Sequence, residues 1–185
     1  MATIHTYTPS RIEWPRLVAR GSAWGNIPMI IADIIDRFGV PTQSALEFGT
    51  EYGYSTSALA NYFAEVTGVD TFTGDQHCGL KEDHYKMTSD ELSPWPNIRL
   101  VQSSYQDYIK NHDRRHDLIH IDIVHTYKNT HDCGEWSVRH SDVVIFHDTE
   151  TFPEVRRACT DLADSHGMEF HNYPHCCGLG ILVRR

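Results

Sequence analysis

Polar and glycine residues follow five short apolar runs of this chain. The runs end near residues 48, 69, 101, 121 and 146, and each has the length of a β-strand. The carboxyl ends of parallel strands meet at one edge of a sheet, and ligands bind there. The groups that would meet at this edge are Gly49, Asp70, Ser103, Ser104, Tyr105, Asp122, His125, His147 and Asp148. This convergence predicts a binding site built from five separate strands.

The first of these segments has the layout of a nucleotide-type cofactor site. Residues 45–56 read Ala-Leu-Glu-Phe-Gly-Thr-Glu-Tyr-Gly-Tyr-Ser-Thr, which predicts a buried strand, a glycine-bearing turn and a helix start. Gly49 and Gly53 would let the backbone approach a ligand closely. Asp70 ends the second strand, 21 residues after Gly49. An acidic side chain at that place accepts hydrogen bonds from ribose hydroxyls.

The charge beside this turn restricts the ligand. Glu47 precedes the first glycine, and its carboxylate would repel a diphosphate. The spacing Gly-x-x-x-Gly-x-Ser also differs from the Gly-x-Gly-x-x-Gly that binds a pyrophosphate. Both features oppose a nicotinamide-dependent oxidoreductase and favour a ligand that carries a positive charge.

Asp122 and His125 are the sharpest catalytic candidates. The sequence Asp-x-x-His directly after a buried strand places a carboxylate and an imidazole on one short loop. Imidazole has an ordinary pKa of about 6.5 and accepts a proton near neutrality. His125 is therefore the candidate general base, and the alternative is a loop histidine that faces solvent.

Residues 47–55, Glu-Phe-Gly-Thr-Glu-Tyr-Gly-Tyr-Ser, resemble motif I of the class I S-adenosylmethionine-dependent methyltransferases. Four further segments, at residues 68–75, 117–127, 143–149 and 178–183, are similar to the same family. The closer resemblance is to small-molecule O-methyltransferases, including the sugar- and macrolide-modifying, macrocin O-methyltransferase-like branch. It spans roughly residues 44–185.

This resemblance implies an enzyme that transfers a methyl group from S-adenosylmethionine to a hydroxyl of a small, sugar-like acceptor. The residues that it assigns to the cofactor are Glu47, Gly49, Thr50, Gly53, Ser55, Asp70, Ser104, Tyr105 and Asp122. Adenine would lie beside Ser104 and Tyr105. Assistance by one Mg²⁺ ion would use Asp122, His147 and Asp148 as ligands.

Two departures from the family pattern keep another function open. Sugar-modifying relatives often read Asp-Gly-Asp-His-Ser-Tyr, whereas this chain has Val124 in place of the second acidic residue. Relatives also carry a Pro-Gly-Gly turn before the fifth strand, where residues 139–142 here read Arg-His-Ser-Asp. The alternative is a catalytically degenerate module that binds S-adenosylmethionine or S-adenosylhomocysteine without transferring a methyl group.

The alternation of elements predicts an α/β fold, a Rossmann-like doubly wound and mostly parallel sheet with an antiparallel C-terminal strand. The expected strands are 44–48, 65–69, 98–101, 117–121, 142–146, 169–173 and 179–183. The expected helices are 27–38, 55–63, 81–87, 105–110, 128–139 and 151–166. Asn26 is expected to cap the first helix, and residues 151–154 read as a capping box for the last.

Size and composition set the remaining expectations. The 185 residues predict one domain, with residues 1–43 as a helical lead-in or cap and residues 44–185 as the cofactor-binding core. A net charge of −9 argues against nucleic acid as a partner. The absence of a long apolar run and of a signal-peptide pattern predicts a cytoplasmic chain without a membrane span. The expected partner is a small-molecule acceptor, and a homo-oligomer is compatible with the sequence.

Overall fold

The computed structural model describes residues 1–6, 16–20, 22, 25–74, 82–175 and 177–185. Its strands are β1 (Thr3–Ile4), β2 (Ser44–Phe48), β3 (Glu65–Asp70), β4 (Ile98–Gln102), β5 (Leu118–Ile121), β6 (Val143–His147), β7 (Glu169–Tyr173) and β8 (Leu179–Val183). Its helices are α1 (Ile27–Phe38), α2 (Tyr54–Ala60), α3 (Tyr85–Leu92), α4 (Tyr105–Asn111), α5 (Tyr127–His140) and α6 (Pro153–His166).

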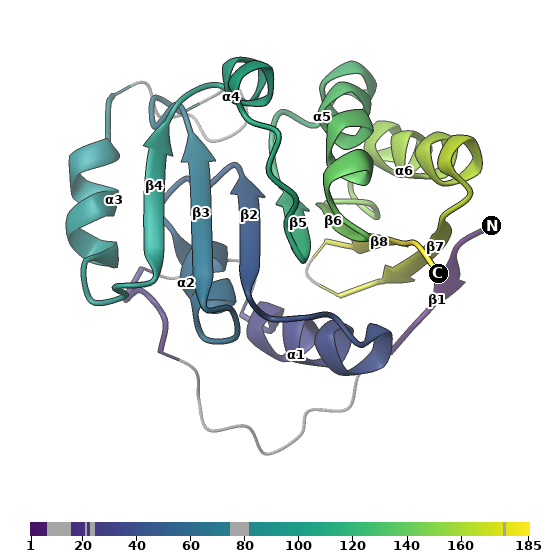
Figure 1. The fold of residues 1–185 in the computed structure, drawn as a ribbon, viewed down its shortest axis with the longest axis horizontal. Coiled ribbons are helices and arrows are strands. Elements are labelled where there is room, and N and C mark those ends of the chain that lie inside the picture. Colours follow the sequence, from purple (N-terminus) through teal and green to yellow (C-terminus); the bar gives the residue numbers. More distant parts are fainter. Residues whose placement is uncertain (7–15, 21, 23–24, 75–81, 176) are drawn as a thin grey trace.

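The strands form one sheet in the order β1-β7-β8-β6-β5-β2-β3-β4. Strand β8 is antiparallel to β6 and β7, and the other neighbouring strands are parallel. Figure 1 shows β4, β3 and β2 side by side, with their arrowheads toward the edge where α4 begins. The predicted α/β class and the antiparallel C-terminal strand are confirmed.

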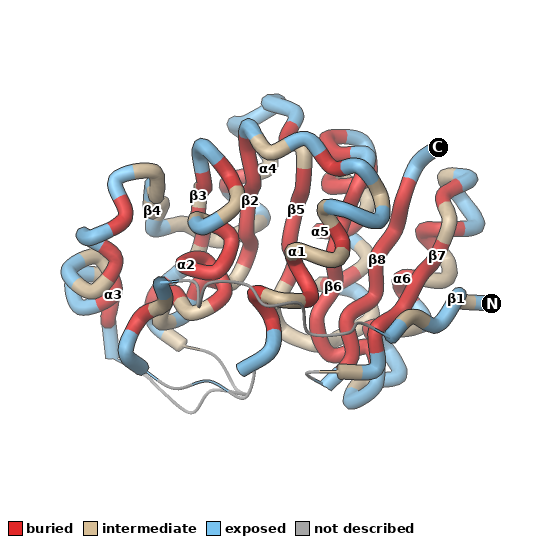
Figure 2. The backbone as a smooth tube through the Cα atoms, turned by 90° about the horizontal axis from the view of Figure 1, so that it is seen from below, coloured by how far each residue is buried: buried red, intermediate tan, exposed pale blue. Residues whose placement is uncertain are grey.

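The helices cover both faces of the sheet because side chains alternate across each strand. On one face α1 and α2 pack against alternate strand residues such as Ala45 and Ile145. On the other face α4, α5 and α6 pack against their neighbours, including Leu46 and Phe146. Figure 2 shows that the central strands are buried along their length. Burial of both faces explains the continuous apolar runs in the sequence.

Helix α1 follows its predicted pattern and packs on the sheet. Ile27, Ile30, Ile31 and Ile34 are buried, and Gly39 ends the helix in a left-handed conformation. Asn26 stands at the N-cap position but its side chain makes no capping hydrogen bond, so the predicted cap is wrong. Pro28, the second residue of the helix, has no N–H to satisfy and suits the first turn.

Four local expectations were wrong. Helix α2 ends at Ala60, three residues early, because Asn61 stops it by donating its side-chain amide to the carbonyl of Ser57. Helix α3 overlaps the predicted range of 81–87 only over its last three residues and continues to Leu92; residue 81 is outside the described residues. Helix α6 has Phe152 at its N-cap. The Glu154 carboxylate accepts the backbone N–H of Tyr127, so no capping box forms.

The fourth difference is strand β1, for which no strand was predicted. It has two residues, and Thr3 and Ile4 pair in parallel with His171 and Asn172 of β7. A strand this short carries no readable alternation, and its partner lies more than 160 residues away. Figure 1 shows both chain ends on this side of the sheet.

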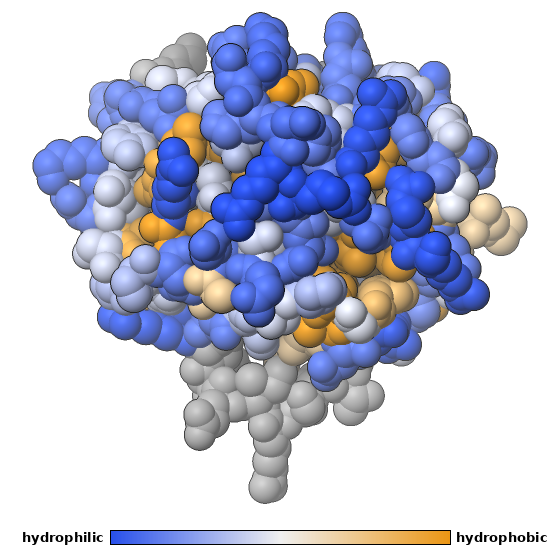
Figure 3. Space-filling model, in the orientation of Figure 1, coloured by the Kyte–Doolittle hydropathy of each residue, from blue (hydrophilic) through white to orange (hydrophobic). Residues whose placement is uncertain are grey.

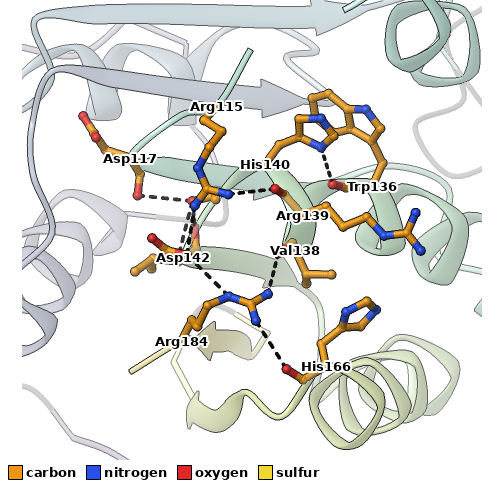
Figure 4. Close-up of polar contacts among 11 residues, drawn as sticks. Arg115, Asp117, Trp136, Val138, Arg139, His140, Asp142, His166 and Arg184 are labelled. Carbon is orange, nitrogen blue, oxygen red and sulfur yellow. Dashed lines mark hydrogen bonds and ion pairs between the residues drawn. The ribbon is translucent and has the colours of Figure 1, made fainter. Parts of the chain in front are cut away.

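The edge opposite the carboxyl ends of the parallel strands is held by ion pairs around Asp142. The guanidinium groups of Arg115 and Arg184 approach one Asp142 oxygen at 2.9 and 3.4 Å (Figure 4). Arg115 also donates to the Arg139 carbonyl, and Arg184 donates to the Val138 carbonyl. The segment where relatives carry a Pro-Gly-Gly turn thus takes part in these ion pairs and hydrogen bonds, which tie the chain end to the sheet.

The face of the molecule seen in Figure 3 is mostly hydrophilic, and its hydrophobic residues form small separate areas. None of the described helices combines the length and apolar character that crossing a bilayer requires.

The close contact between β2 and β5 predicts that any residue other than glycine at position 49 destabilises the protein. Gly49 has a φ of +91°, and a Cβ there would lie 1.7 Å from the Asp122 carbonyl oxygen. Gly39 also has a positive φ, but a Cβ there meets nothing within 4 Å. Gly39→Ala should therefore cost only the backbone strain, about 1–2 kcal/mol. Gly49→Ala should cost roughly 1–3 kcal/mol beyond that, measured by urea unfolding. Equal losses of unfolding free energy in the two variants would contradict a steric clash between a Cβ at position 49 and the Asp122 carbonyl.

Candidate functional site

A cavity of about 920 Å³ opens at the carboxyl edge of the sheet, which is within the range of small-molecule sites. The ends of β2 to β6 contribute to its wall. The predicted site residues on its lining are Gly49, Thr50, Ser55, Asp70, Ser104, Tyr105, Asp122, His125, His147 and Asp148. Glu47 and Gly53 are not among its lining residues. The structure therefore brings most of the predicted residues to one cavity.

The turn after β2 is fixed by contacts within the protein. The N–H of Gly53 donates to the Thr50 carbonyl at 2.8 Å, which closes the turn. A Cβ at Gly53, where φ is +82°, would lie 2.6 Å from a Leu92 methyl group. Gly53 thus permits packing of α3, while Gly49 itself lines the cavity. Within the described part of the chain, the Thr50 hydroxyl has no hydrogen-bond partner.

Glu47 lies beneath the turn in a buried polar network. Its side chain is fully buried and accepts a hydrogen bond from the Thr56 hydroxyl. Its other oxygen lies 2.9 Å from Nδ1 of His120 on β5. The carboxylate thereby ties α2 and β5 to β2, and it is separated from the cavity. A direct contact between Glu47 and a cofactor stays a prediction.

Asp70 joins the two turns that follow β2 and β3. One carboxylate oxygen accepts the Glu51 N–H at 2.8 Å, and the other accepts the Phe72 N–H at 2.7 Å. The side chain therefore acts as a turn cap and also lines the cavity. The oxygen that accepts from Glu51 has a further lone pair with which it can accept a ligand hydroxyl.

Ser104 and Tyr105 begin α4 on the far wall. Ser104 is the N-cap, and its hydroxyl oxygen accepts the Asp107 N–H at 3.1 Å. The Tyr105 hydroxyl donates to the side-chain oxygen of Asn129 at 3.0 Å. Burial raises the pKa of Tyr105 to about 12, so the phenol is neutral and cannot serve as a base near pH 7.

Four titratable side chains converge at the ends of β5 and β6. Nε2 of His125 lies 3.2 Å from Oδ1 of Asp122 and 2.8 Å from Oδ2 of Asp148. Nδ1 of His147 lies 3.3 and 3.4 Å from the same two oxygens. The side chains are 7–26% exposed. We refer to Asp122, His125, His147 and Asp148 as the His–Asp cluster.

The charges in this cluster shift the pKa values of its members. Burial disfavours ionised Asp122, but the charge of His147 and hydrogen bonds from both histidines outweigh it and lower the pKa of Asp122. Burial likewise opposes protonation of His125, yet its bonds to Asp122 and Asp148 raise the pKa of His125 to about 9. In the absence of a metal ion, His125 is thus protonated at neutral pH and cannot accept a proton there.

The backbone and one aromatic ring hold the cluster in place. His125 stacks on the Phe152 ring, with centroids 4.4 Å apart and an interplanar angle of 11°. Asp148 has a φ of +65°, and its carbonyl accepts the N–H groups of Thr151 and Phe152. The four donor atoms all lie within 4.8 Å of one another, so they could hold a metal ion. Mg²⁺ fits this set poorly because two of the four donors are imidazole nitrogens.

Several cavity residues had escaped prediction. His84, which precedes α3, lines the cavity beside Tyr52 with ring centroids 4.9 Å apart. The guanidinium of Arg20 lies 4.0 Å from the centre of the Tyr52 ring. Both come from irregular segments that carry no sequence pattern. Asn129 could have been found, because it lies in the first turn of the helix that follows the Asp-x-x-His loop.

The ion pairs of His125 predict a pH-dependent stability in metal-free protein. Since folding raises the pKa from 6.5 to about 9, the stabilisation is complete below pH 6.5 and is lost as pH rises through about 9. The free energy of unfolding of wild type should exceed that of His125→Gln by roughly 1–3 kcal/mol below pH 6.5, and this difference should shrink toward pH 9. Urea unfolding in chelator tests this, with His131→Gln as a control outside the cluster. A difference that does not change with pH would refute the assignment.

Comparison with known proteins identifies the family. A model described as a methyltransferase domain matches residues 46–149, which is more than half of the chain. The matched region runs from β2 to the His–Asp cluster and so includes most of the residues that line the cavity. A search of the curated proteins found no match.

Solved structures share the fold at low sequence identity. The O-methyltransferase from Bacillus cereus in complex with S-adenosylhomocysteine has a TM-score of 0.60 and 15% identity, over 91% of this chain and 84% of that chain. The O-methyltransferase NovP has a TM-score of 0.65 and 14% identity, over 86% and 78%. A ribosomal protein methylase from Lactobacillus delbrueckii subsp. bulgaricus has a TM-score of 0.62 and 18% identity, over 98% and 91%.

At these identities the structural similarity shows the fold alone, and the neighbours differ by name in what they methylate. The acceptor therefore does not follow from the fold. The family match and the sheet order agree with each other. Together they identify this chain as a member of the class I S-adenosylmethionine-dependent methyltransferases.

Proposed function

We propose that this protein transfers a methyl group from S-adenosylmethionine to a hydroxyl of a small, sugar-like acceptor. The observation that carries the proposal is that one cavity holds both the turn after β2 and the His–Asp cluster. The first is a place for a nucleoside cofactor, and the second is a place for proton chemistry. Their common cavity lets a methyl donor and a hydroxyl acceptor meet.

The cofactor is proposed to lie along the ends of β2, β3 and β4. Gly49 and Thr50 would lie against its methionine part, and Asp70 would accept hydrogen bonds from the ribose hydroxyls. Ser104 and Tyr105 would border the adenine. The cofactor supplies an electrophilic methyl group, so the protein has to align the acceptor oxygen with it and exclude competing water.

The acceptor hydroxyl must lose its proton as its oxygen attacks the methyl group. In the metal-free protein the proposed proton acceptor is His125, which lies on the cavity wall next to Asp122. It can take this role only after it has released its own proton. A divalent cation bound by the cluster would instead supply acidification of a hydroxyl, by lowering its pKa.

The acceptor is proposed to be polar because several polar side chains lie on the remaining cavity wall. Asn129 and His84 both reach the lining, and Arg20 and Ser22 extend it. The buried His84 Nε2 atom has no hydrogen-bond partner among the described residues. A hydroxylated small molecule such as a sugar offers the groups that these side chains can bind.

A second candidate is a module that binds the cofactor without transferring its methyl group. The ion pairs of His125 favour it, because a protonated base is inactive at neutral pH. Val124 lines the cavity at the position where sugar-modifying relatives often carry an aspartate. This chain therefore has no carboxylate there that could replace the base. Both candidates require cofactor binding, so methyl transfer to an acceptor distinguishes them.

Cofactor binding should depend on Asp70. Asp70→Asn should weaken S-adenosylhomocysteine binding by about tenfold or more, because the amide keeps the size but loses the charge that strengthens hydrogen bonds to ribose. Calorimetry measures the change. Asp117→Asn is a matched control, since the Asp117 carboxylate also accepts two backbone N–H groups but does not line the cavity. Unchanged affinity in Asp70→Asn would contradict the proposed orientation of the cofactor.

Methyl transfer should depend on His125. In chelator, turnover on a panel of hydroxylated acceptors should rise with pH through about 9, as His125 loses its proton. His125→Ala should lower turnover by about 10²-fold or more and leave S-adenosylhomocysteine affinity nearly unchanged. If metal-free wild type shows no turnover at any pH, His125 is not the base. If no acceptor is methylated with or without added metal ions, the binding module is favoured.

A further inference from the structure

We infer that the His–Asp cluster binds a divalent first-row transition ion rather than Mg²⁺, with both imidazoles among its ligands. The proposed ligands are His125 Nε2, His147 Nδ1, and one carboxylate oxygen each from Asp122 and Asp148. This assignment differs from the Mg²⁺ site expected from the sequence, in which Asp122, His147 and Asp148 were the ligands and His125 was the base. It concerns metal binding alone and does not depend on methyl transfer.

The geometry of the cluster suits one shared ion. Each imidazole nitrogen faces the same two carboxylate oxygens, at 3.2 and 2.8 Å from His125 and at 3.3 and 3.4 Å from His147. Ligands in a tetrahedral site with bonds of about 2.0–2.2 Å lie roughly 3.3–3.6 Å apart. Three of the four separations are already close to this value. An ion at the centre therefore requires only small side-chain movements.

The charge of the cluster also suits a divalent ion. Two carboxylates and two neutral imidazoles carry a charge that one divalent cation cancels. Without an ion, the two carboxylate charges lie close together, because both approach the same two imidazole nitrogens. A single central cation satisfies all four groups at once.

The donor chemistry determines the class of ion. Mg²⁺ prefers six oxygen ligands, several of them water, whereas imidazole ligands suit zinc, iron, nickel and copper. Half of the donors here are imidazole nitrogens. Zn²⁺ and Co²⁺ are therefore suitable probes, and His125 is a ligand in the metal-loaded protein. Its proposed role as a base is confined to the metal-free protein.

The experiment is a titration of chelator-treated protein with Zn²⁺ and with Mg²⁺, in the absence of cofactor and acceptor. Calorimetry should give one tight Zn²⁺ site per chain, with Mg²⁺ weaker by about 100-fold or more. X-ray absorption of the zinc-loaded wild type should show two imidazole ligands. Mg²⁺ affinity within about tenfold of Zn²⁺ affinity, or fewer than two imidazoles on the ion, would overturn the inference.

Variants separate this site from surface histidines, since the chain has 13 histidines. His125→Asn and His147→Asn should each weaken Zn²⁺ binding by about tenfold or more. His131→Asn should not, because His131 stacks on Tyr127 in α5 and is not a member of the cluster. Equal losses in all three variants would refute the site. Should His147→Asn fail to fold, X-ray absorption of the zinc-loaded wild type still shows whether two imidazoles bind the ion.

The result is independent of the proposed function. Zinc bound as described, in a protein without methyl transfer, would support the metal site and argue against the enzyme. Methyl transfer by a protein whose cluster binds no transition ion would support the enzyme and argue against the metal site.

Discussion

The close approach of the Gly49 backbone to Asp122 is the constraint on which the site depends. Strands β2 and β5 are neighbours in the sheet although about seventy residues separate them along the chain, and Gly49 and Asp122 are the first residues beyond their paired ends. The missing side chain at Gly49 leaves room for the Asp122 carbonyl. The proposed cofactor turn and the His–Asp cluster are thereby brought against each other, and both line one cavity. A methyl donor and a proton acceptor can only cooperate at such short range.

Beneath this contact, a buried polar network supports the turn. Glu47, Thr56 and His120 connect β2, α2 and β5 through hydrogen bonds in an otherwise apolar interior. Groups of this kind are costly to bury unless they are paired, and each of the three has a partner here. The acidic residue that looked like a ligand contact in the sequence thus supports the backbone from which the ligand site is built.

The His–Asp cluster is the proposed place both of proton transfer by His125 and of metal binding. Without a metal ion, His125 is held in ion pairs by the carboxylates of Asp122 and Asp148 and keeps its proton at neutral pH. With a metal ion, the same carboxylates would have another positive charge to bind. The same atoms therefore serve either as ion-pair partners or as ligands. Which cation occupies the cluster, a proton or a metal ion, determines which chemistry His125 can perform.

The sequence alone determined the strand and helix alternation, the sheet class and many of the residues at the cavity, because period and strand-end position are local properties of the chain. It also indicated the family, through short motifs. Only the tertiary structure decided that Glu47 and Gly53 face the interior, that His84 and Arg20 reach the cavity, and that β1 pairs with β7. It likewise decided that His125 meets both carboxylates instead of standing free as a base. These outcomes depend on contacts between segments far apart in the chain, and no local pattern of residues encodes the distance between two such segments.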